Sequence, residues 1–89
     1  MLAAEGSYTE VHLEDGRRLL VSKGLGKLHR CLPPALFYRC HDSYVVNLAH
    51  VVRLIRHGGY RVELCGGLMV RVARRRWGGM GAAMERLSK

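Results

Sequence analysis

Four side chains that could do chemistry stand in a row at residues 39–42, where the sequence reads "RCHD". Cysteine, histidine and aspartate build nucleophilic sites and metal centres, whereas arginine binds anions. In an extended segment successive side chains point to opposite faces, so Cys40 and His41 cannot converge on one reactant or metal ion. We therefore predict no catalytic group and no metal site. Arg39 and His41 should share one face as binding residues, and Asp42 should share the other with a half-buried Cys40.

The three cysteines, Cys31, Cys40 and Cys65, form an odd set with no pair at metal-ligand spacing. Neither a disulfide framework nor a zinc knuckle is indicated, and a reducing compartment fits best. A disulfide between two of them as a redox switch stays open. The other histidines have no partners at metal spacing and are interpreted as structural: His12, His29, His50 and His57.

Charge says most about the partner. The chain has 15 Lys and Arg against 7 Asp and Glu, a net charge of +8, and most of the acids precede the first basic residue, Arg17. The later part of the chain therefore builds a basic surface, which favours nucleic acid as the partner. Duplex DNA is the first hypothesis. The alternative is a module that binds RNA or single strands without sequence specificity, but such modules stack bases on aromatic platforms, and the aromatics here are few and scattered.

Length and hydropathy bound the class of protein. The 89 residues, 48% of them hydrophobic, suffice for one domain with a single core. No apolar run approaches the roughly 20 residues that span a bilayer, and no signal peptide is visible, so we expect a cytoplasmic location without membrane contact. An enzyme is disfavoured because the sequence shows no acid/base pair, nucleophile elbow or phosphate-gripping glycine loop, and no cofactor is expected.

The elements that position these residues begin with a hairpin. Residues 8–21 alternate around Asp15-Gly16, which predicts two strands joined by a two-residue turn. Residues 23–32 then carry leucines at steps of three and four, with Ser22 as an N-cap and Pro33-Pro34 as a stop. This pattern predicts a short helix.

The rest of the chain is also mainly extended. Residues 35–48 predict two short extended pieces flanking the polar quartet, with Asn47 as a turn or cap residue. Residues 50–72 form three apolar runs broken by two glycine pairs, which predicts an antiparallel three-strand meander. A short C-terminal helix is indicated by residues at helical spacing: Trp77, Met80, Met84 and Leu87. The expected fold is mostly β, with small antiparallel sheets, namely the hairpin and the meander, and two short helices.

The order of these parts resembles a known family. The chain reads "AEGSY" before the first hairpin, "RCHDSYVVNL" in the middle and "VRVARRRW" near the end. In this order and spacing the three stretches resemble the LytTR DNA-binding domain, the output domain of bacterial response regulators. The resemblance covers nearly the whole chain.

The resemblance implies sequence-specific binding of double-stranded DNA by loops that enter two successive major grooves and contact the backbone between them. Ser7 in "EGSY" and Arg75 in "ARRRW" match base-reading positions. Arginine can bond O6 and N7 of one guanine, which discriminates against a wrong base by ~1–3 kcal/mol. Backbone or supporting contacts are expected from Tyr8, Lys23, Arg39, His41, Asp42, Arg74 and Arg76.

Two residues depart from the family pattern. Asp42 stands where a basic or amide residue is usual, and phosphate would repel it. It either accepts a hydrogen bond from a cytosine amino group or holds Arg39 or a neighbouring arginine in place, and we favour the second role. Ser7 stands where asparagine is more usual and cannot make a bidentate adenine contact, so base reading there should be more permissive.

The chain as a whole is expected to be a single domain of residues 1–89, with "MLAA" as a remnant of the family's first strand. Regulators of this family carry a receiver or a sensor before the DNA-binding part, and this chain has neither. We expect weak or no self-association of the isolated domain, and binding to each half of a direct-repeat site.

Overall fold

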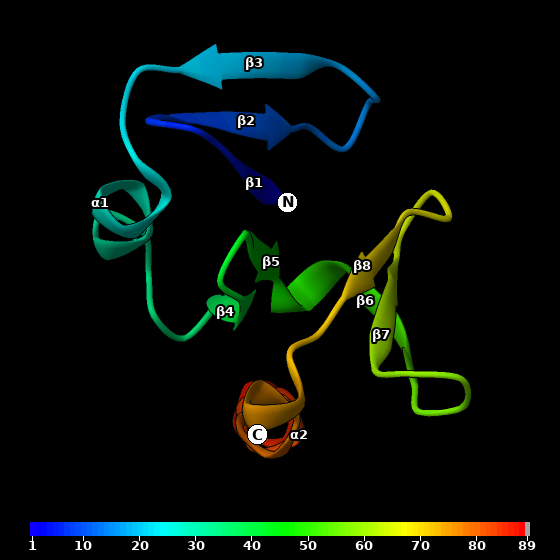
Figure 1. The fold of residues 1–89 in the computed structure, drawn as a ribbon. Coiled ribbons are helices and arrows are strands. Elements are labelled where there is room, and N and C mark those ends of the chain that lie inside the picture. The colour runs from blue at the N-terminus through cyan, green and yellow to red at the C-terminus, as the bar shows by residue number, and fades with distance from the viewer. Residues whose placement is uncertain (89) are drawn as a thin grey trace.

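Two antiparallel sheets and two α-helices make up the computed structural model, which describes residues 1–88 (Figure 1). The strands are β1 (Leu2–Glu5), β2 (Tyr8–His12), β3 (Arg18–Val21), β4 (Phe37–His41), β5 (Tyr44–Asn47), β6 (Val51–Ile55), β7 (Arg61–Leu64) and β8 (Met69–Arg71). The helices are α1 (Leu25–Arg30) and α2 (Trp77–Leu87), with 3-10 turns η1 (Leu48–His50) and η2 (Arg74–Arg76). The sheet orders are β3-β2-β1-β5-β4 and β6-β7-β8. The mostly β prediction is confirmed.

Strand β1 pairs with both β2 and β5 and so joins the first hairpin to the β4–β5 pair, which were predicted from the sequence as separate elements. The segment expected to be a remnant pairs through Leu2 with Val11 of β2 on one side and with Val45 of β5 on the other. Leu2 is buried and packs with Val45 and with Leu25 of α1. The hairpin and the β4–β5 pair therefore belong to one five-stranded sheet. Alanines at positions 3 and 4 have low strand propensity, which hides this strand in the sequence.

The first hairpin is confirmed, but its turn is longer than predicted. Leu13 N still donates to Arg17 O across the hairpin at 2.9 Å, so three residues, not two, form the loop. The Asp15 carboxylate accepts from the backbone N–H of Arg17 at 3.0 Å and from its Nε at 2.7 Å. These two bonds, one from the backbone and one from the side chain of Arg17, stabilise the longer turn.

The predicted mid-chain helix is confirmed as α1, with a different N-cap. Gly24 occupies the cap position and no side chain caps the helix, so the assignment of Ser22 was wrong. Leu25 anchors the helix against β1 and β5.

The polar quartet does not interrupt a strand, contrary to the prediction. Arg39, Cys40 and His41 lie within β4, and only Asp42 lies in the tight turn to β5. A register irregularity between Tyr38 and His41 lets the strand continue through these polar residues. Asn47 is confirmed as a cap, because its side-chain oxygen accepts from Ala49 N at 2.9 Å at the start of η1.

The meander and the C-terminal helix are confirmed, and together they close the larger core. Met80 of α2 is fully buried and packs with residues of both sheets, including Cys40 and Val62. Trp77 begins the helix and stacks at a tilt on Tyr60, with ring centroids 4.9 Å apart. Figure 1 shows the three-stranded sheet beside the five-stranded one, with α1 and α2 on separate parts of the molecule. Helix α2 contacts β4, the strand that carries the polar quartet.

Candidate nucleic-acid interface

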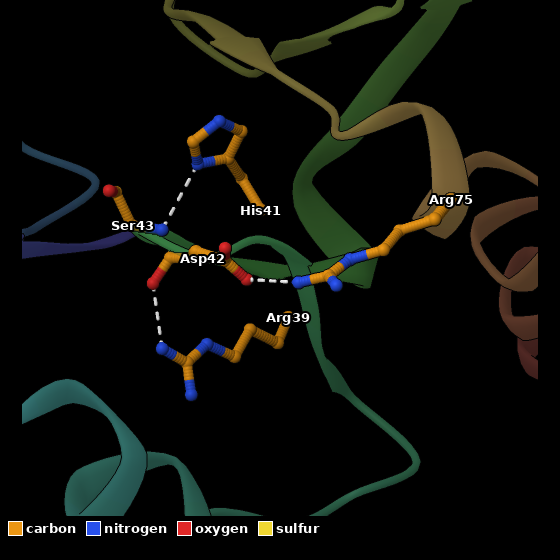
Figure 2. Close-up of polar contacts among 5 residues, drawn as sticks. All are labelled: Arg39, His41, Asp42, Ser43 and Arg75. Carbon is orange, nitrogen blue, oxygen red and sulfur yellow. Dashed lines mark hydrogen bonds and ion pairs between the residues drawn. The ribbon is translucent and has the colours of Figure 1, made fainter.

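The turn between β4 and β5 is held by polar bonds from three sides (Figure 2). Arg39 Nη2 donates to the backbone carbonyl of Asp42 at 2.7 Å, and Ser43 N donates to His41 Nδ1 at 3.0 Å. Because Nδ1 accepts this bond, the neutral imidazole carries its proton on Nε2. His41 therefore offers a donor at the far side of its ring while its near side fixes the turn.

The third bond comes from a distant part of the sequence. Arg75 Nη2 donates to Asp42 Oδ1 at 2.7 Å, and the two side chains are 67% and 69% exposed. Figure 2 shows Arg39 and Arg75 reaching the turn from different elements. The prediction that Asp42 holds an arginine is confirmed, with Arg75 as the arginine. Asp42 lies in the exposed turn, so its predicted place on the buried face with Cys40 was wrong.

The backbone explains why Arg75 arrives at this turn. Ala73 N donates to the carbonyl of Cys40 at 2.8 Å, which lays the chain after β8 against β4. The η2 turn then projects Arg74 and Arg75 into solvent, while Arg76 is half-buried. The three arginines therefore lie directly before the N-terminus of α2, where free amides and the helix dipole favour an anion.

Tyr38 and Gly79 position this turn, and neither was predicted as a site residue from the sequence. The Tyr38 hydroxyl donates to the carbonyl of Arg76 at 2.8 Å, linking β4 to the end of η2. A Cβ at residue 79 would collide with the same hydroxyl, so only glycine permits this close approach. In the sequence, the glycine pair shortly after the three arginines could have indicated this close approach, because glycine is unfavourable within a helix and needs another reason to be there.

Ser7 lies at the tip of the β1–β2 turn, as the family position implies. Gly6 has a φ of +62°, which glycine adopts without strain, and Ser7 is exposed. Tyr8 follows at the start of β2 and is 46% exposed. Because Ala4 N donates to Ser43 O at 2.8 Å, this turn and the Asp42–Ser43 turn lie at the same end of the sheet.

Lys23 lies on the linker that leads from β3 into α1 and is exposed. Its backbone carbonyl accepts a 2.8 Å hydrogen bond from the hydroxyl of Thr9, which is fully buried. Thr9 thus fixes where the lysine leaves the sheet. The alternation of residues 8–21 is visible in the sequence, but the partner of the Thr9 hydroxyl is not.

Cys40 is chemically inert in this setting. It is fully buried rather than half-buried as predicted, and this burial raises the pKa of its thiol to about 11. A thiol of that kind is neither a nucleophile nor a ready metal ligand at neutral pH. Cys31 and Cys65 are exposed free thiols. Across residues 1–88, no group of three or more histidine, cysteine or acidic side chains is placed to hold a metal ion.

Two of the histidines interpreted as structural lie near acidic side chains. His12 Nε2 lies 2.6 Å from the Glu10 carboxylate, and His50 Nε2 lies 3.7 Å from that of Glu14. His29 Nε2 lies 3.3 Å from the carbonyl of Phe37.

None of the helices in the described part of the chain has both the length and the apolar character needed to cross a bilayer.

A net charge of +8 and exposed arginines on a turn at one end of the sheet are typical of a nucleic-acid-binding module. The chain matches the family model of the LytTr DNA-binding domain over residues 1–84 and belongs to that family. The resemblance seen in the sequence is thereby confirmed. The family is one of DNA-binding domains and not of enzymes.

Two known proteins are similar to this chain. The chain is 39% identical over 69 residues to the CO-responsive transcriptional regulator RcoM of Rhodospirillum rubrum. The aligned residues cover 78% of this chain and 26% of that protein. It therefore spans about a quarter of the length of this relative. In structure it is similar to the LytTr DNA-binding domain of a protein described as a methyl-accepting/DNA response regulator from Bacillus cereus. The TM-score is 0.81 at 24% identity, covering 93% of this chain and 77% of the other, which establishes the shared fold.

Proposed function

We propose that this domain binds double-stranded DNA sequence-specifically and reads bases in the major groove through two turns. Arg75 on η2 is the principal base-reading residue, and Ser7 on the β1–β2 turn reads a second position more permissively. Tyr8, Lys23, Arg39, His41, Arg74 and Arg76 contact or support contacts to the backbone, and Asp42 orients Arg75.

One observation carries this proposal. The Arg75–Asp42 pair is exposed, yet Asp42 is itself fixed through its carbonyl by Arg39 at 2.7 Å. An exposed ion pair adds little to stability, so such fixing has little use for folding. It does hold a guanidinium in a defined orientation, which bidentate reading of guanine requires.

The surface favours duplex over single-stranded nucleic acid. Single-strand binders stack successive bases on aromatic side chains. Among the large hydrophobic side chains that are exposed within residues 1–88, Tyr8 is the aromatic one, which favours duplex over single-strand binding. The net charge of +8 supplies the attraction for phosphate in either case.

The domain acts, in this proposal, as the output part of a bacterial transcription regulator, working in the cytoplasm. Residues 1–89 form one DNA-binding unit, and a receiver or sensor domain in the full protein brings two copies to direct-repeat sites. The isolated domain would bind each half-site weakly, because avidity multiplies two modest affinities only when the copies are linked.

Selection of bound duplexes from a randomised pool at moderate salt tests the proposal. Wild type should enrich a short motif, and Arg75→Ala should lose or relax preference at one guanine, by about tenfold. Arg17→Ala is the matched control. Like Arg75, Arg17 is exposed and bonds an aspartate at 2.7 Å, but it lies at the opposite end of β2 from Ser7.

The outcomes separate cleanly. A motif that Arg17→Ala keeps and Arg75→Ala relaxes at one position supports direct reading by Arg75. Binding without any enriched motif would mean that the positive charge gives only a nonspecific grip. Single-stranded oligonucleotides that compete for the protein as well as the duplexes do would favour the RNA or single-strand alternative.

A further inference from the structure

We infer that Asp42 is a second base-reading group, and that Arg75 and Asp42 together select one G·C pair in a fixed orientation. This inference rests on the proposed function and goes beyond it, because it assigns Asp42 a contact of its own with DNA. The ligand group is the exocyclic amino group of the cytosine that pairs with the guanine read by Arg75.

The geometry leaves the necessary atoms free. The hydrogen bond between the two side chains joins one guanidinium nitrogen, Arg75 Nη2, to one carboxylate oxygen, Asp42 Oδ1. Arginine has further N–H donors in a planar fork, and a carboxylate has a second oxygen with its own lone pairs. Both side chains are about two-thirds exposed, so these remaining atoms can face a groove.

The pair thus presents donors beside an acceptor on one rigid unit. Along the major groove, a G·C pair shows two acceptors, N7 and O6 of guanine, followed by the amino donor of cytosine. Donors from Arg75 match the guanine acceptors, and the free oxygen of Asp42 matches the cytosine donor. The order of groups on the protein therefore complements the order on this base pair.

Other base pairs fit poorly. An A·T pair places an amino donor where O6 of guanine would be, and that donor opposes the arginine N–H groups. The reversed C·G pair places its cytosine donor against Arg75 and an acceptor against the carboxylate. A donor facing a donor, or an acceptor facing an acceptor, leaves both groups without a hydrogen bond in the interface, so these base pairs should bind much more weakly.

The negative charge of Asp42 does not prevent this contact. Arg75 bonds the carboxylate directly, and Arg39 bonds the carbonyl of the same residue. The local group therefore carries net positive charge near the phosphates. An isolated aspartate in the groove would lack this compensation.

Base analogues test the inference on DNA without relying on protein variants alone. The site is the strongest selected duplex at its Arg75-dependent pair. It is prepared unmodified, with 7-deazaguanine in place of the guanine, and with 2-pyrimidinone, which lacks the amino group, in place of the cytosine. Affinities are measured for wild type, Asp42→Ala, Arg75→Ala and the control Asp15→Ala, which removes an aspartate of a similarly exposed pair with Arg17.

For wild type and Asp15→Ala, we expect removal of the cytosine amino group to weaken binding about tenfold more than it does for Asp42→Ala. Because the analogue weakens the base pair equally for every protein, only this difference counts. An equal loss for wild type and Asp42→Ala would overturn the inference. If that equal loss occurs while 7-deazaguanine weakens binding by wild type and not by Arg75→Ala, the proposed function stands and only the role of Asp42 fails. If no motif is selected, the proposed function itself fails.

Discussion

Asp42 is an acidic residue within a basic surface, and its neighbours determine what it can do. Its carboxylate bonds Arg75 and its carbonyl bonds Arg39, so the residue organises two arginines at once. The sequence could place it beside its histidine in a polar quartet. It could not pair it with a residue 33 positions away, because that contact depends on how β8 returns along β4.

Ser7 offers a gain-of-function prediction. Asparagine at this position can bond N6 and N7 of one adenine, whereas a single hydroxyl cannot. Ser7→Asn should therefore strengthen the preference for adenine at one position of the selected motif. Selection with both proteins measures this, with the exposed Ser88→Asn as the control. An unchanged motif would show that the β1–β2 turn does not read bases.

Thr9 should contribute to stability through its buried hydroxyl. Thr9→Val keeps the shape but leaves the Lys23 carbonyl without its 2.8 Å donor. The free energy of unfolding should fall by about 1–3 kcal/mol, as measured by urea denaturation. Thr9→Ser, which retains the hydroxyl, should restore the bond to Lys23 at the cost of one buried methyl group. A Val variant as stable as wild type would argue against this bond.

At the scale of elements, α2 gives a test that separates packing from helix propensity. Alanine normally stabilises a helix by about 0.5–1 kcal/mol over glycine. Gly78→Ala and Gly81→Ala meet open space and should show this gain in urea denaturation. Gly79→Ala meets the Tyr38 hydroxyl and should destabilise instead. It should also weaken DNA binding, because Tyr38 holds the end of η2.

A second variant identifies the cause. In a Tyr38→Phe background the colliding oxygen is absent, so the penalty of Gly79→Ala should shrink. The coupling between the two substitutions is read from a double-mutant cycle. Additive effects would mean that the collision does not determine stability.

Elements with strong periodicity could be predicted from the sequence, and those set by tertiary contacts could not. The meander and α2 follow from alternation and helical spacing. Strand β1 did not, because Ala3 and Ala4 are poor strand formers whose pairing on both sides decides their conformation. The extent of β4 was likewise missed, since its polar residues lie along a strand in which Cys40 is the one fully buried residue.

At the scale of the whole molecule, the buried thiol of Cys40 predicts how stability depends on pH. Burial raises its pKa from 9.0 to about 11, so the folded state keeps this proton longer than the unfolded state does. The protonated Cys40 thiol therefore contributes fully to the free energy of unfolding below about pH 9, and this contribution is lost as the pH rises towards about 11.

Urea denaturation near about pH 8 and about pH 10.5 measures this dependence. Cys40→Ala should lose less stability between the two pH values than wild type does. The exposed Cys65→Ala is the control and should behave like wild type. Equal losses for all three proteins would contradict the assignment.

In the candidate site, the positions of single residues could be predicted from the sequence, but their grouping in space could not. The family motifs placed Ser7 and Arg75 on turns, and both residues lie there. What the sequence could not supply is the spatial grouping. The Asp42 turn lies beside the β1–β2 turn through Ala4 and Ser43, and beside η2 through Cys40 and Ala73. These contacts are backbone hydrogen bonds between segments far apart in the chain, which no side-chain pattern encodes.

The most direct test of the central claim is dimethyl sulfate protection of the selected duplex. This reagent methylates guanine N7 in the major groove and adenine N3 in the minor groove. We predict that wild type protects one guanine N7, that Arg17→Ala protects it equally, and that Arg75→Ala leaves it reactive at saturating protein. Protection of that guanine by Arg75→Ala, or protection confined to adenine N3, would contradict major-groove reading by Arg75.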